Sequence, residues 1–380
     1  MVGRLSRILS LKAGSILLLK GRATARCKGR VTILGMDVDG REVNVRHGKT
    51  LPLEAHGPAT VSLSIEEGDG GYSIVDKDSS RCRVGTGIWQ EVIDAIKDSK
   101  PKSIMLVGAT DTGKSTLATY ISNIAVAERL AVGIVDSDIG QGDIAPPACM
   151  GSCMVREQVL DLRDLKADEY YFIGRITPAG VEDHIIRGVM HLINSLHADM
   201  VIVNTDGYVN EQGLRYKARM AEDVDADMVV MLGDIDYNRM NIFKARVVVV
   251  VRVDTSSSIQ KSRGERIARR IEQYKRFLAG GREVRFRTKS KEFVMLCRRA
   301  MLMHSSMVVD DTLIIPSDML SGMFVALAMM DRVMGFAILD RVEGSIATMI
   351  TNYEGEFDTV MLSSIRLTRD MSMEHRLDLI

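Results

Sequence analysis

The stretch GATDTGKST, residues 108–116, decides the fold of the central part of this chain. It fits the pattern G-x-x-x-x-G-K-[ST], follows the apolar run IMLV (104–107) and precedes the helix-compatible run TLATYISNIAVAERL (116–130). This order of strand, glycine-rich loop and helix is typical of a phosphate-binding loop, because the loop N–H groups and the helix N-terminus both attract phosphate. We therefore expect the whole loop to hold a nucleotide: Gly108, Ala109, Thr110, Asp111, Thr112, Gly113, Lys114, Ser115 and Thr116.

Two residues of this loop have specific expected roles. In loops of this kind the lysine reaches the β- and γ-phosphates, and the hydroxyl that follows it ligates Mg²⁺. We expect these roles for Lys114 and Ser115.

The sequence around the loop alternates between apolar strands and amphipathic helices from about residue 102 to 279. The strands are continuously apolar, as in DMVIVNT (199–205) and ARVVVVVRV (245–253), which is typical of a parallel sheet covered on both faces. Helices are expected at 113 to about 129, around 182–197 and around 211–223. This pattern predicts an α/β P-loop NTPase core with a parallel sheet.

The flanking segments are rich in short β runs. Residues 13–76 predict five or six strands in a small antiparallel sandwich or barrel, and 88–100 predict a connecting helix. β segments return after residue 281, where the run FVALAMM (324–330) fits either a strand or a short helix. We therefore expect three domains: an N-terminal β domain (1–85), a P-loop kinase domain (86–281) and a C-terminal β-rich domain (282–380).

Composition restricts the functional class. Lys+Arg and Asp+Glu both total 50, so no bulk positive charge holds a polyanion and any nucleic-acid contact must be local. The five scattered cysteines do not resemble a disulfide framework, and we assign no metal to Cys149 and Cys153. No apolar run reaches the length of a membrane span and the N-terminus lacks a signal-peptide pattern. We expect a cytoplasmic protein.

Two carboxylates follow the strand after the loop helix, in VDSDIGQG (135–142). Asp136 lies 22 residues after Lys114, which leaves room for one helix and a returning strand. Alternation in an extended segment would put Asp136 and Asp138 on one side, so that one holds the metal shell while the other accepts a proton from an attacking hydroxyl. The simpler alternative is that both cap the strand end. Gln141 is expected to orient the hydroxyl or the γ-phosphate.

Three further segments are candidates for the substrate side. Thr177 follows the run YYFIGRI (170–176), and Thr205, Gly207 and Tyr208 follow DMVIV (199–203), so both are expected at strand ends on the ligand-binding edge. Tyr208 either stacks on a nucleobase or packs internally. An arginine-rich helix carries Arg266 and Arg270 at i, i+4, where they either close over a triphosphate or belong to a solvated basic face.

Together these motifs resemble the Clp/Grc family of polynucleotide 5′-hydroxyl kinases. The resemblance rests on GATDTGKST, DSDIGQGD (136–143), NTDGYV (204–209) and KSRGERIARRIEQYKRF (261–277), and it extends to the order of the three domains. The paired aspartates with Gly-Gln are more discriminating than the P-loop alone. The compact chain looks like a stand-alone archaeal member.

The resemblance implies a role for each site residue. Lys114 and Ser115 would hold ATP and Mg²⁺, Asp136 would contribute to the metal shell, and Asp138 would activate an RNA 5′-hydroxyl. Thr205, Gly207 and Tyr208 match the family's T-x-G-W clasp for terminal nucleotides, with Tyr208 in place of Trp. Thr177 matches a second substrate position, and Arg266 and Arg270 match the lid pattern R-x-x-x-R. The implied substrate is the 5′-hydroxyl end of RNA, or of DNA, and the implied partners are RNA-processing proteins.

Two other functional classes stay open. A GTPase switch would need [NT]-K-x-D for guanine, and Thr288-Lys289-Ser290-Lys291 lacks the aspartate. A nucleotide-binding scaffold without turnover would not need Lys114, Asp138 and the lid arginines together. Phosphate transfer to a 5′-hydroxyl oligonucleotide distinguishes the kinase from both.

Overall fold

The structure is a computed structural model that describes residues 3–76, 85–233, 241–252, 261–296, 298–303, 308–309 and 312–377. It divides into two compact units. The first unit comprises Met1–Ile134, Met154–Leu165 and His197–Lys261, and the second comprises Val135–Cys153, Lys166–Leu196 and Ser262–Ile380. The three-domain division expected from the sequence stays a prediction.

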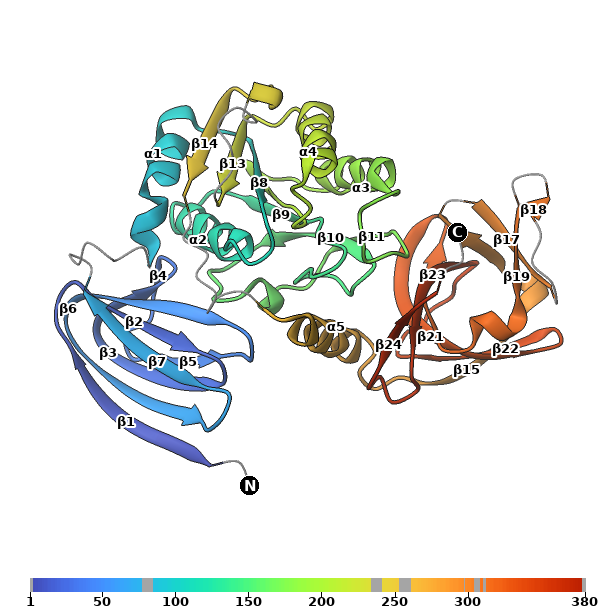
Figure 1. The fold of residues 1–380 in the computed structure, drawn as a ribbon, viewed down its shortest axis with the longest axis horizontal. Helices are drawn as coiled ribbons and strands as arrows, with labels where there is room; N and C mark the ends of the chain where they lie inside the picture. The colour runs from blue at the N-terminus through green and yellow to red at the C-terminus, as the bar shows by residue number, and fades with distance from the viewer. Residues whose placement is uncertain are drawn as a thin grey trace. The chain divides into compact units, whose positions relative to one another are not determined.

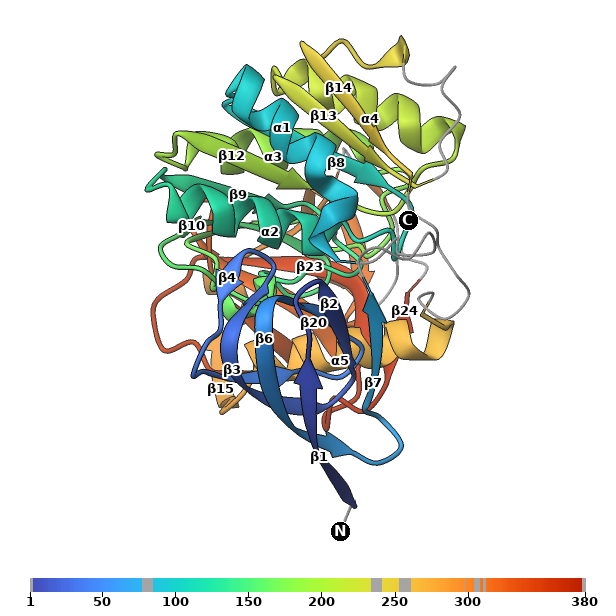
Figure 2. The same cartoon turned by 90° about the vertical axis from the view of Figure 1, so that its left-hand side faces the viewer.

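The first unit begins with an antiparallel sheet of seven strands (Figures 1 and 2). Its strands are β1 (Arg4–Leu11), β2 (Ser15–Lys20), β3 (Ala23–Ile33), β4 (Met36–Asp37), β5 (Glu42–Val45), β6 (Thr50–Glu66) and β7 (Gly71–Asp76). The order is β4-β3-β6-β2-β7, while β1 pairs with β6 and β5 with β3. Successive side chains of β3 point to opposite faces of the sheet, so Ala25 and Cys27 are buried while Arg26 and Lys28 are exposed.

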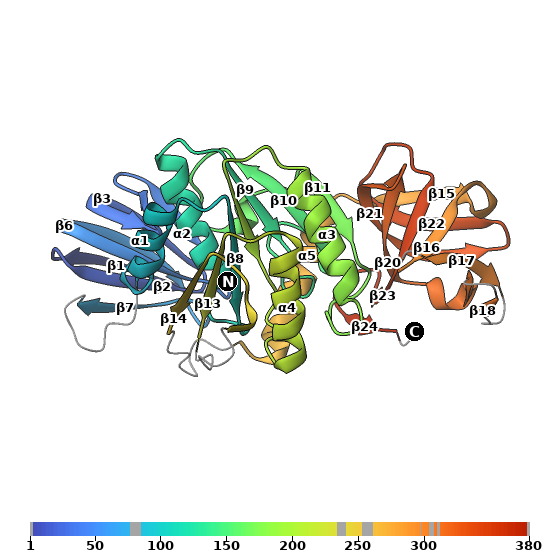
Figure 3. The same ribbon diagram turned by 90° about the horizontal axis from the view of Figure 1, so that it is seen from above.

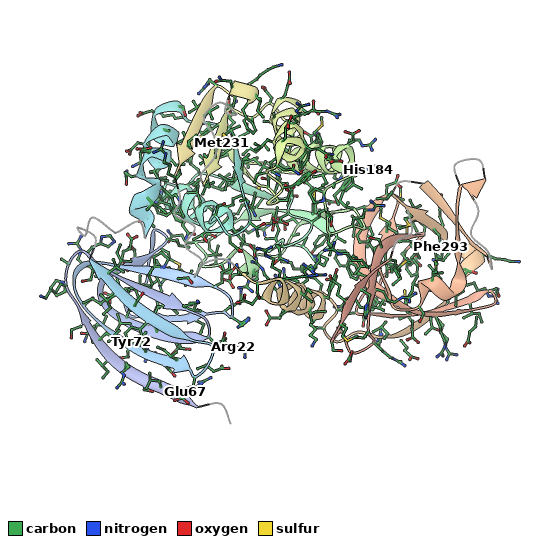
Figure 4. The ribbon with its side chains drawn as sticks, viewed as in Figure 1. Arg22, Glu67, Tyr72, His184, Met231 and Phe293 are labelled. Atoms are coloured by element: carbon green, nitrogen blue, oxygen red, sulfur yellow. The ribbon has the colours of Figure 1, made fainter. Side chains whose placement is uncertain are left out.

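The α/β part of the first unit confirms the predicted parallel sheet. Strands β12 (Met200–Asn204), β8 (Ser103–Gly108), β13 (Met228–Leu232) and β14 (Val247–Val251) are parallel neighbours in that order, and β9 (Val132–Asp136) lies next to β12. Every residue of β9, β12 and β13 is buried, among them Met231, which Figure 4 labels. The helices are α1 (Gln90–Ser99), α2 (Lys114–Ala127) and α4 (Glu211–Asp223). The helices predicted at 88–100, at 113 to about 129 and around 211–223 are therefore confirmed.

The second unit contains a hairpin that the sequence did not predict. β10 (Cys149–Val155) pairs antiparallel with β11 (Glu169–Phe172). The run YYFIGRI was expected to be a strand ending at Ile176, but β11 ends at Phe172. Helices α3 (Glu182–Asn194) and α5 (Arg263–Phe277) also belong to this unit.

The C-terminal part of the second unit is a sheet of ten strands, seen from above in Figure 3. The strands are β15 (Arg282–Arg287), β16 (Glu292–Met295), β17 (Arg298–Met303), β18 (Val308–Val309), β19 (Thr312–Pro316), β20 (Met323–Met329), β21 (Arg332–Glu343), β22 (Ile346–Thr351), β23 (Thr359–Leu367) and β24 (Glu374–Arg376). The order is β15-β22-β21-β20-β23-β16-β17-β19-β18, with β24 paired to β23. The ambiguous run FVALAMM is therefore a strand for all but its last residue. Short 3-10 turns occupy Thr86–Trp89, Leu162–Asp164, Thr288–Ser290 and Ser317–Leu320.

Helix α5 packs its apolar face on this C-terminal sheet. Tyr274 is fully buried, and its ring centroid lies 4.9 Å from that of Phe324 on β20. Ile271 and Leu278 belong to the same buried cluster, together with Phe336 of β21. The apolar side of α5 is thus occupied, which leaves its polar side to carry the arginines.

Candidate active site

The glycine-rich loop connects the buried strand β8 to helix α2. Gly113 precedes the helix with a φ of 91°, and Asp111 has a φ of 64°, so the loop curls through two left-handed residues. A Cβ at Gly108 would lie 2.6 Å from the Leu232 carbonyl oxygen of β13, so only glycine fits where β8 ends. The local fold is that of a P-loop, as the sequence predicted.

Polar side chains fasten the loop to itself. Lys114 is buried, and its Nζ donates to the carbonyl oxygens of Gly108 and Ala109, both at 2.8 Å. Thr112 donates its hydroxyl to the Ala109 carbonyl at 2.8 Å. Ser115 Oγ accepts a hydrogen bond from Asn204 Nδ2 at 3.3 Å, which joins the first turn of α2 to the end of β12. The ammonium charge is therefore directed into the loop where phosphates bind in this motif.

Asp111 of the loop is joined to a residue the sequence did not single out. Its carboxylate accepts from the Lys261 backbone N–H at 3.0 Å and pairs with Lys261 Nζ at 3.0 Å. Ser262, the next residue, caps α5 in a capping box with Glu265. Asp111 thus fixes the position of Lys261 within the first unit, a role that its place in the motif did not suggest.

A buried ion pair supports the 205–208 segment. Asp206 accepts from Lys217 Nζ at 2.5 Å, from the Tyr216 hydroxyl at 2.8 Å and from the Tyr208 backbone N–H at 2.8 Å. Lys217 is 0% exposed and also donates to the Tyr208 carbonyl at 2.9 Å. The signal for Lys217 was present in the sequence, since it shares the apolar face of α4 with Leu214 and Met220.

Gly207 brings this segment against the P-loop. A Cβ at Gly207 would lie 2.2 Å from Thr110 Oγ1 and 2.7 Å from the Thr110 backbone N, which no side chain tolerates. The expected substrate-side loop and the expected nucleotide loop are therefore in direct contact within the first unit.

Thr205 and Tyr208 differ in their placement. Thr205 was expected to offer a hydroxyl to substrate, but it is fully buried and donates to the Leu106 carbonyl of β8 at 2.7 Å. Its hydroxyl therefore connects the end of β12 to β8. Tyr208 is half-buried, so its ring retains a solvent-accessible part.

In the second unit, Asp136 is held by backbone N–H groups. The carboxylate is 1% exposed, and its Oδ2 accepts from the N–H groups of Asp143 at 2.5 Å and Ile144 at 3.4 Å. Its Oδ1 accepts from the Asp138 N–H at 3.4 Å. β9 ends at Asp136, so the extended alternation assumed for Asp138 does not continue past the strand.

Asp138 and Gln141 lie in the turn that follows. Asp138 Oδ1 accepts from the N–H groups of Gly140 at 3.0 Å and Gln141 at 2.8 Å, which fixes the carboxylate's orientation. The Gln141 side-chain amide donates to the Gly140 carbonyl at 2.9 Å and to the Arg266 carbonyl at 3.2 Å. Gln141 therefore connects this turn to α5, a contact that the expected role in orienting substrate did not include.

Helix α5 is fastened to the same turn by further polar contacts. Arg269 Nη2 pairs at 2.6 Å with Asp143, whose side chain is 0% exposed. Gln273 Nε2 donates to the carbonyls of Gly142 at 2.9 Å and Asp143 at 3.1 Å, and Arg276 donates to the Asp143 carbonyl at 2.9 Å. The arginine helix and the 136–145 turn thus form one connected body in the second unit.

The predicted lid arginines have different surroundings. Arg266 is half-buried, near the start of the helix. Arg270 is buried and paired with Glu374 of β24, so it could reach a phosphate only if that pair opened. Thr177 is exposed, lies five residues beyond the end of β11 and accepts a 3.4 Å hydrogen bond from Arg376. Thr177 was expected to follow a strand directly, and this is wrong because β11 ends at Phe172.

None of the helices in the described ranges is long and apolar enough to cross a membrane. Within those ranges no group of three or more His, Cys, Asp or Glu side chains is arranged to hold a metal. Cys27, Cys149 and Cys153 are buried, while Cys82 and Cys297 lie outside the described residues.

The loop after β8, helix α2 and the parallel strands beside them define a P-loop nucleotide-binding protein. Residues 108–280 match the family model described as the mRNA cleavage and polyadenylation factor CLP1 P-loop. The match covers less than half of the chain, and it confirms the resemblance seen in the motifs of this segment.

Several curated proteins that are similar to this chain are named as polyribonucleotide 5′-hydroxyl-kinases. A polyribonucleotide 5′-hydroxyl-kinase of Pyrococcus horikoshii is 32% identical over 202 residues, which cover 52% of this chain and 55% of that protein. One of Methanocaldococcus jannaschii is 34% identical over 145 residues, covering 37% and 40%. The polyribonucleotide 5′-hydroxyl-kinase Clp1 of Gallus gallus is 28% identical over 149 residues, covering 36% and 35%. The chain thus spans about half the length, or less, of these relatives.

A solved structure has the same overall fold. Wild-type Clp1p, in a complex with Pcf11p, superimposes with a TM-score of 0.71 over 96% of this chain and 99% of that chain, at 13% sequence identity. This likeness concerns the fold alone.

Proposed function

We propose that this protein transfers the γ-phosphate of ATP to the 5′-hydroxyl end of RNA. The observation that carries the proposal is the P-loop with its buried Lys114 in a segment of the CLP1 P-loop family, whose curated relatives are named as polyribonucleotide 5′-hydroxyl-kinases. The Clp1p relative was solved with a protein partner, and we extend the proposal to a protein partner from RNA processing.

The P-loop would bind and orient the triphosphate. The loop N–H groups surround the β-phosphate, and the Lys114 ammonium neutralises negative charge on the β- and γ-oxygens. Because Lys114 already lies in the loop, held by two carbonyl groups, it needs only a local movement to reach phosphate oxygens. This arrangement supports positioning and electrostatic stabilisation as the main sources of rate enhancement.

Oxygen donors suited to Mg²⁺ are present in the chain. Ser115 offers a hydroxyl whose oxygen faces the Asn204 amide, and Asp136 offers a buried carboxylate that backbone N–H groups already orient. Mg²⁺ usually retains several waters, so a carboxylate of this kind suits a coordinated water. Mg²⁺ held by these residues would supply positive charge that stabilises the transfer.

Asp138 would act as the general base. The RNA 5′-oxygen attacks the γ-phosphorus, its proton passes to the Asp138 carboxylate, and the bond from phosphorus to the bridging oxygen breaks to release ADP. Asp138 Oδ1 is oriented by two backbone N–H groups, which supports a fixed carboxylate at this position. Tyr208, with its partly exposed ring, would stack on the terminal base.

A labelling experiment tests the proposal. The protein is incubated with γ-labelled ATP, Mg²⁺ and one RNA oligonucleotide that ends in either a 5′-hydroxyl or a 5′-phosphate. We expect label on the 5′-hydroxyl strand alone, with ADP formed in equal amount. Release of labelled inorganic phosphate without label on RNA would instead indicate a nucleotide hydrolase, and the kinase proposal would fail.

A further inference from the structure

The neutral net charge of the chain conceals a strongly basic segment. Residues 1–60 contain eleven Lys and Arg residues but only four Asp and Glu residues. The whole chain has equal numbers of both, so the remaining residues carry the compensating excess of acids. Residues 61–76, which complete the N-terminal sheet, add four acids and no Lys or Arg, so the excess of positive charge lies in the strands that precede them.

Cationic side chains gather on the solvent-facing side of β3. Arg26 and Lys28 alternate with the buried Ala25 and Cys27, so both project from the same face of the sheet. Arg30 is also exposed, next to the irregularity in the β3–β6 register between Gly29 and Val31. We call Arg26, Lys28 and Arg30 the β3 cation row.

Hydroxyl groups lie beside this row on the neighbouring strands. Ser62 and Thr60 of β6 are directly opposite Arg26 and Lys28, and both are exposed. Across β6, Ser10 of β1 is opposite Thr60. Directly opposite residues are roughly 5 Å apart, so cations and hydroxyl donors form one continuous polar face. Hydroxyl and guanidinium groups are the usual partners of phosphate oxygens.

Glu42 of β5 lies directly opposite Arg26, but the β3 cation row forms no ion pair within the described residues. Arg22 on the same sheet pairs with Glu66 and Asp69, whereas in the described part of the chain no carboxylate comes within ion-pair distance of the row. Figure 4 draws the side chains of this sheet and labels Arg22. The row therefore consists of three exposed cations, with one exposed carboxylate opposite Arg26.

The face has no means of reading bases. Residues 4–66 contain no Phe, Tyr or Trp, so no aromatic ring of these strands is available for base stacking. On β1, which lies across β6 from the row, the large exposed apolar side chains are Leu5 and Ile8, 38% and 77% exposed, too few to bury in a lipid surface. The chemistry of the face thus suits a flexible polyanion that is recognised by its phosphates.

We infer that the β3 cation row and its adjacent hydroxyls bind the phosphodiester backbone of single-stranded RNA beyond its 5′ end. This inference rests on the proposed function, because it assigns the face to the same substrate strand. Binding would be independent of sequence, would favour long strands over short ones, and would weaken with salt.

The test compares two RNA lengths in the full-length protein. In one variant the row is removed as Arg26→Ala, Lys28→Ala and Arg30→Ala; all three positions are exposed, so the core is untouched. The matched control removes three exposed cations elsewhere, as Lys97→Ala, Lys102→Ala and Arg187→Ala, for the same change in net charge. Two RNA substrates that end in a 5′-hydroxyl, about 4 and about 20 nucleotides long, are compared, and KM is measured for each at several salt concentrations.

We expect that in the row variant KM no longer depends on RNA length and that the other kinetic parameters do not change. Its KM for the long strand should rise while its kcat and its KM for the short strand stay at wild-type values. Three lost phosphate contacts should reduce the log–log salt slope by about 2, so between about 50 and 200 mM salt the wild-type KM should change roughly 20-fold more than the variant KM. The control should resemble the wild type.

Failure of the RNA-binding inference and failure of the kinase proposal give different results. If the row variant and the wild type share one KM and one salt slope for the long strand while both phosphorylate RNA, the inference is overturned and the kinase proposal survives. If the wild type phosphorylates neither strand, the proposed function fails, and direct binding of a fluorescent RNA of about 20 nucleotides then decides whether the row binds RNA.

Discussion

Arg270 and Glu374 form a bidentate ion pair. Arg270 Nε and Nη2 donate to the two Glu374 carboxylate oxygens at 2.7 and 2.8 Å. The two side chains are only 10% and 3% exposed. The pair joins α5 to β24, the last described strand, so an arginine expected to contact phosphate holds the C-terminal part of the second unit together.

Removing Glu374 should destabilise the fold. Glu374→Ala would leave the Arg270 charge buried without its partner, which typically costs about 3 kcal/mol of unfolding free energy. The control Glu354→Ala removes one partner of the exposed Arg282–Glu354 pair and should cost under about 1 kcal/mol. Chemical denaturation measures both. Equal, small losses in the two variants would show that the buried pair contributes no more than a surface pair.

Lys217 should act on RNA recognition through the 205–208 segment. Lys217→Met leaves Asp206 without its cation and Tyr208 without a carbonyl contact, so the KM for RNA should rise about tenfold or more, as expected from the loss of an interaction worth about 1.4 kcal/mol. The KM for ATP should change far less. Steady-state kinetics with each substrate varied in turn provides the measurement.

The contrary result for Lys217 would be an equal rise in both KM values. A double variant, Lys217→Met with Asp206→Asn, supplies the control, because it removes the unpaired charge. If Lys217 acts through Asp206, the double variant should be no worse than Lys217→Met alone.

Gly207 should affect nucleotide binding although it belongs to the expected substrate-side loop. Gly207→Ala would place a Cβ 2.7 Å from the Thr110 backbone N and displace the P-loop. We expect at least a tenfold loss of ATP affinity, measured by calorimetry, for a distortion costing about 1.4 kcal/mol. Gly71→Ala is the control, because nothing lies within 4 Å of a Cβ there. Unchanged ATP affinity in Gly207→Ala would show that the two loops are not coupled.

Asp161 gives the fold a defined pH dependence. Burial opposes ionisation of Asp161, but Lys49 and Arg163 more than offset it and hold the pKa of this carboxyl well below its ordinary value. A depressed folded pKa contributes stability above the unfolded pKa of about 3.9, and this contribution is lost as the pH falls toward the folded pKa.

Asp161→Asn should therefore lower Tm at neutral pH, and the difference from wild type should narrow below about pH 4. Thermal unfolding followed by circular dichroism across this range checks the sign. A gap that widens on acidification would contradict the assignment.

Local patterns predicted the features that depend on neighbouring residues. The P-loop and the helix over 211–223 were identified because a buried strand, a glycine-rich turn and helical periodicity are all written within a few residues. The same reasoning misplaced the end of the strand before Thr177, since apolar content alone does not show that the strand ends at Phe172 and not at Ile176.

Contacts between distant segments could not be read from the sequence. The Arg270–Glu374 pair spans 104 residues and the Arg269–Asp143 pair 126, and nothing near α5 distinguishes a buried arginine from a solvated one. Thr205 shows the same limit, because its hydroxyl was expected at a ligand edge and instead bonds the neighbouring strand. Lys217 is the exception, since a lysine on an apolar helix face signals a buried partner.

Initial rates of label transfer from ATP to a 5′-hydroxyl RNA, measured side by side for wild type, Lys114→Ala and Asp138→Asn, test the account most directly. We predict that Asp138→Asn binds ATP normally yet transfers about 10² to 10⁴ times more slowly, and that Lys114→Ala loses about 10² or more. Wild-type transfer rates in Asp138→Asn would contradict the account, because the 5′-hydroxyl would then lose its proton without this carboxylate.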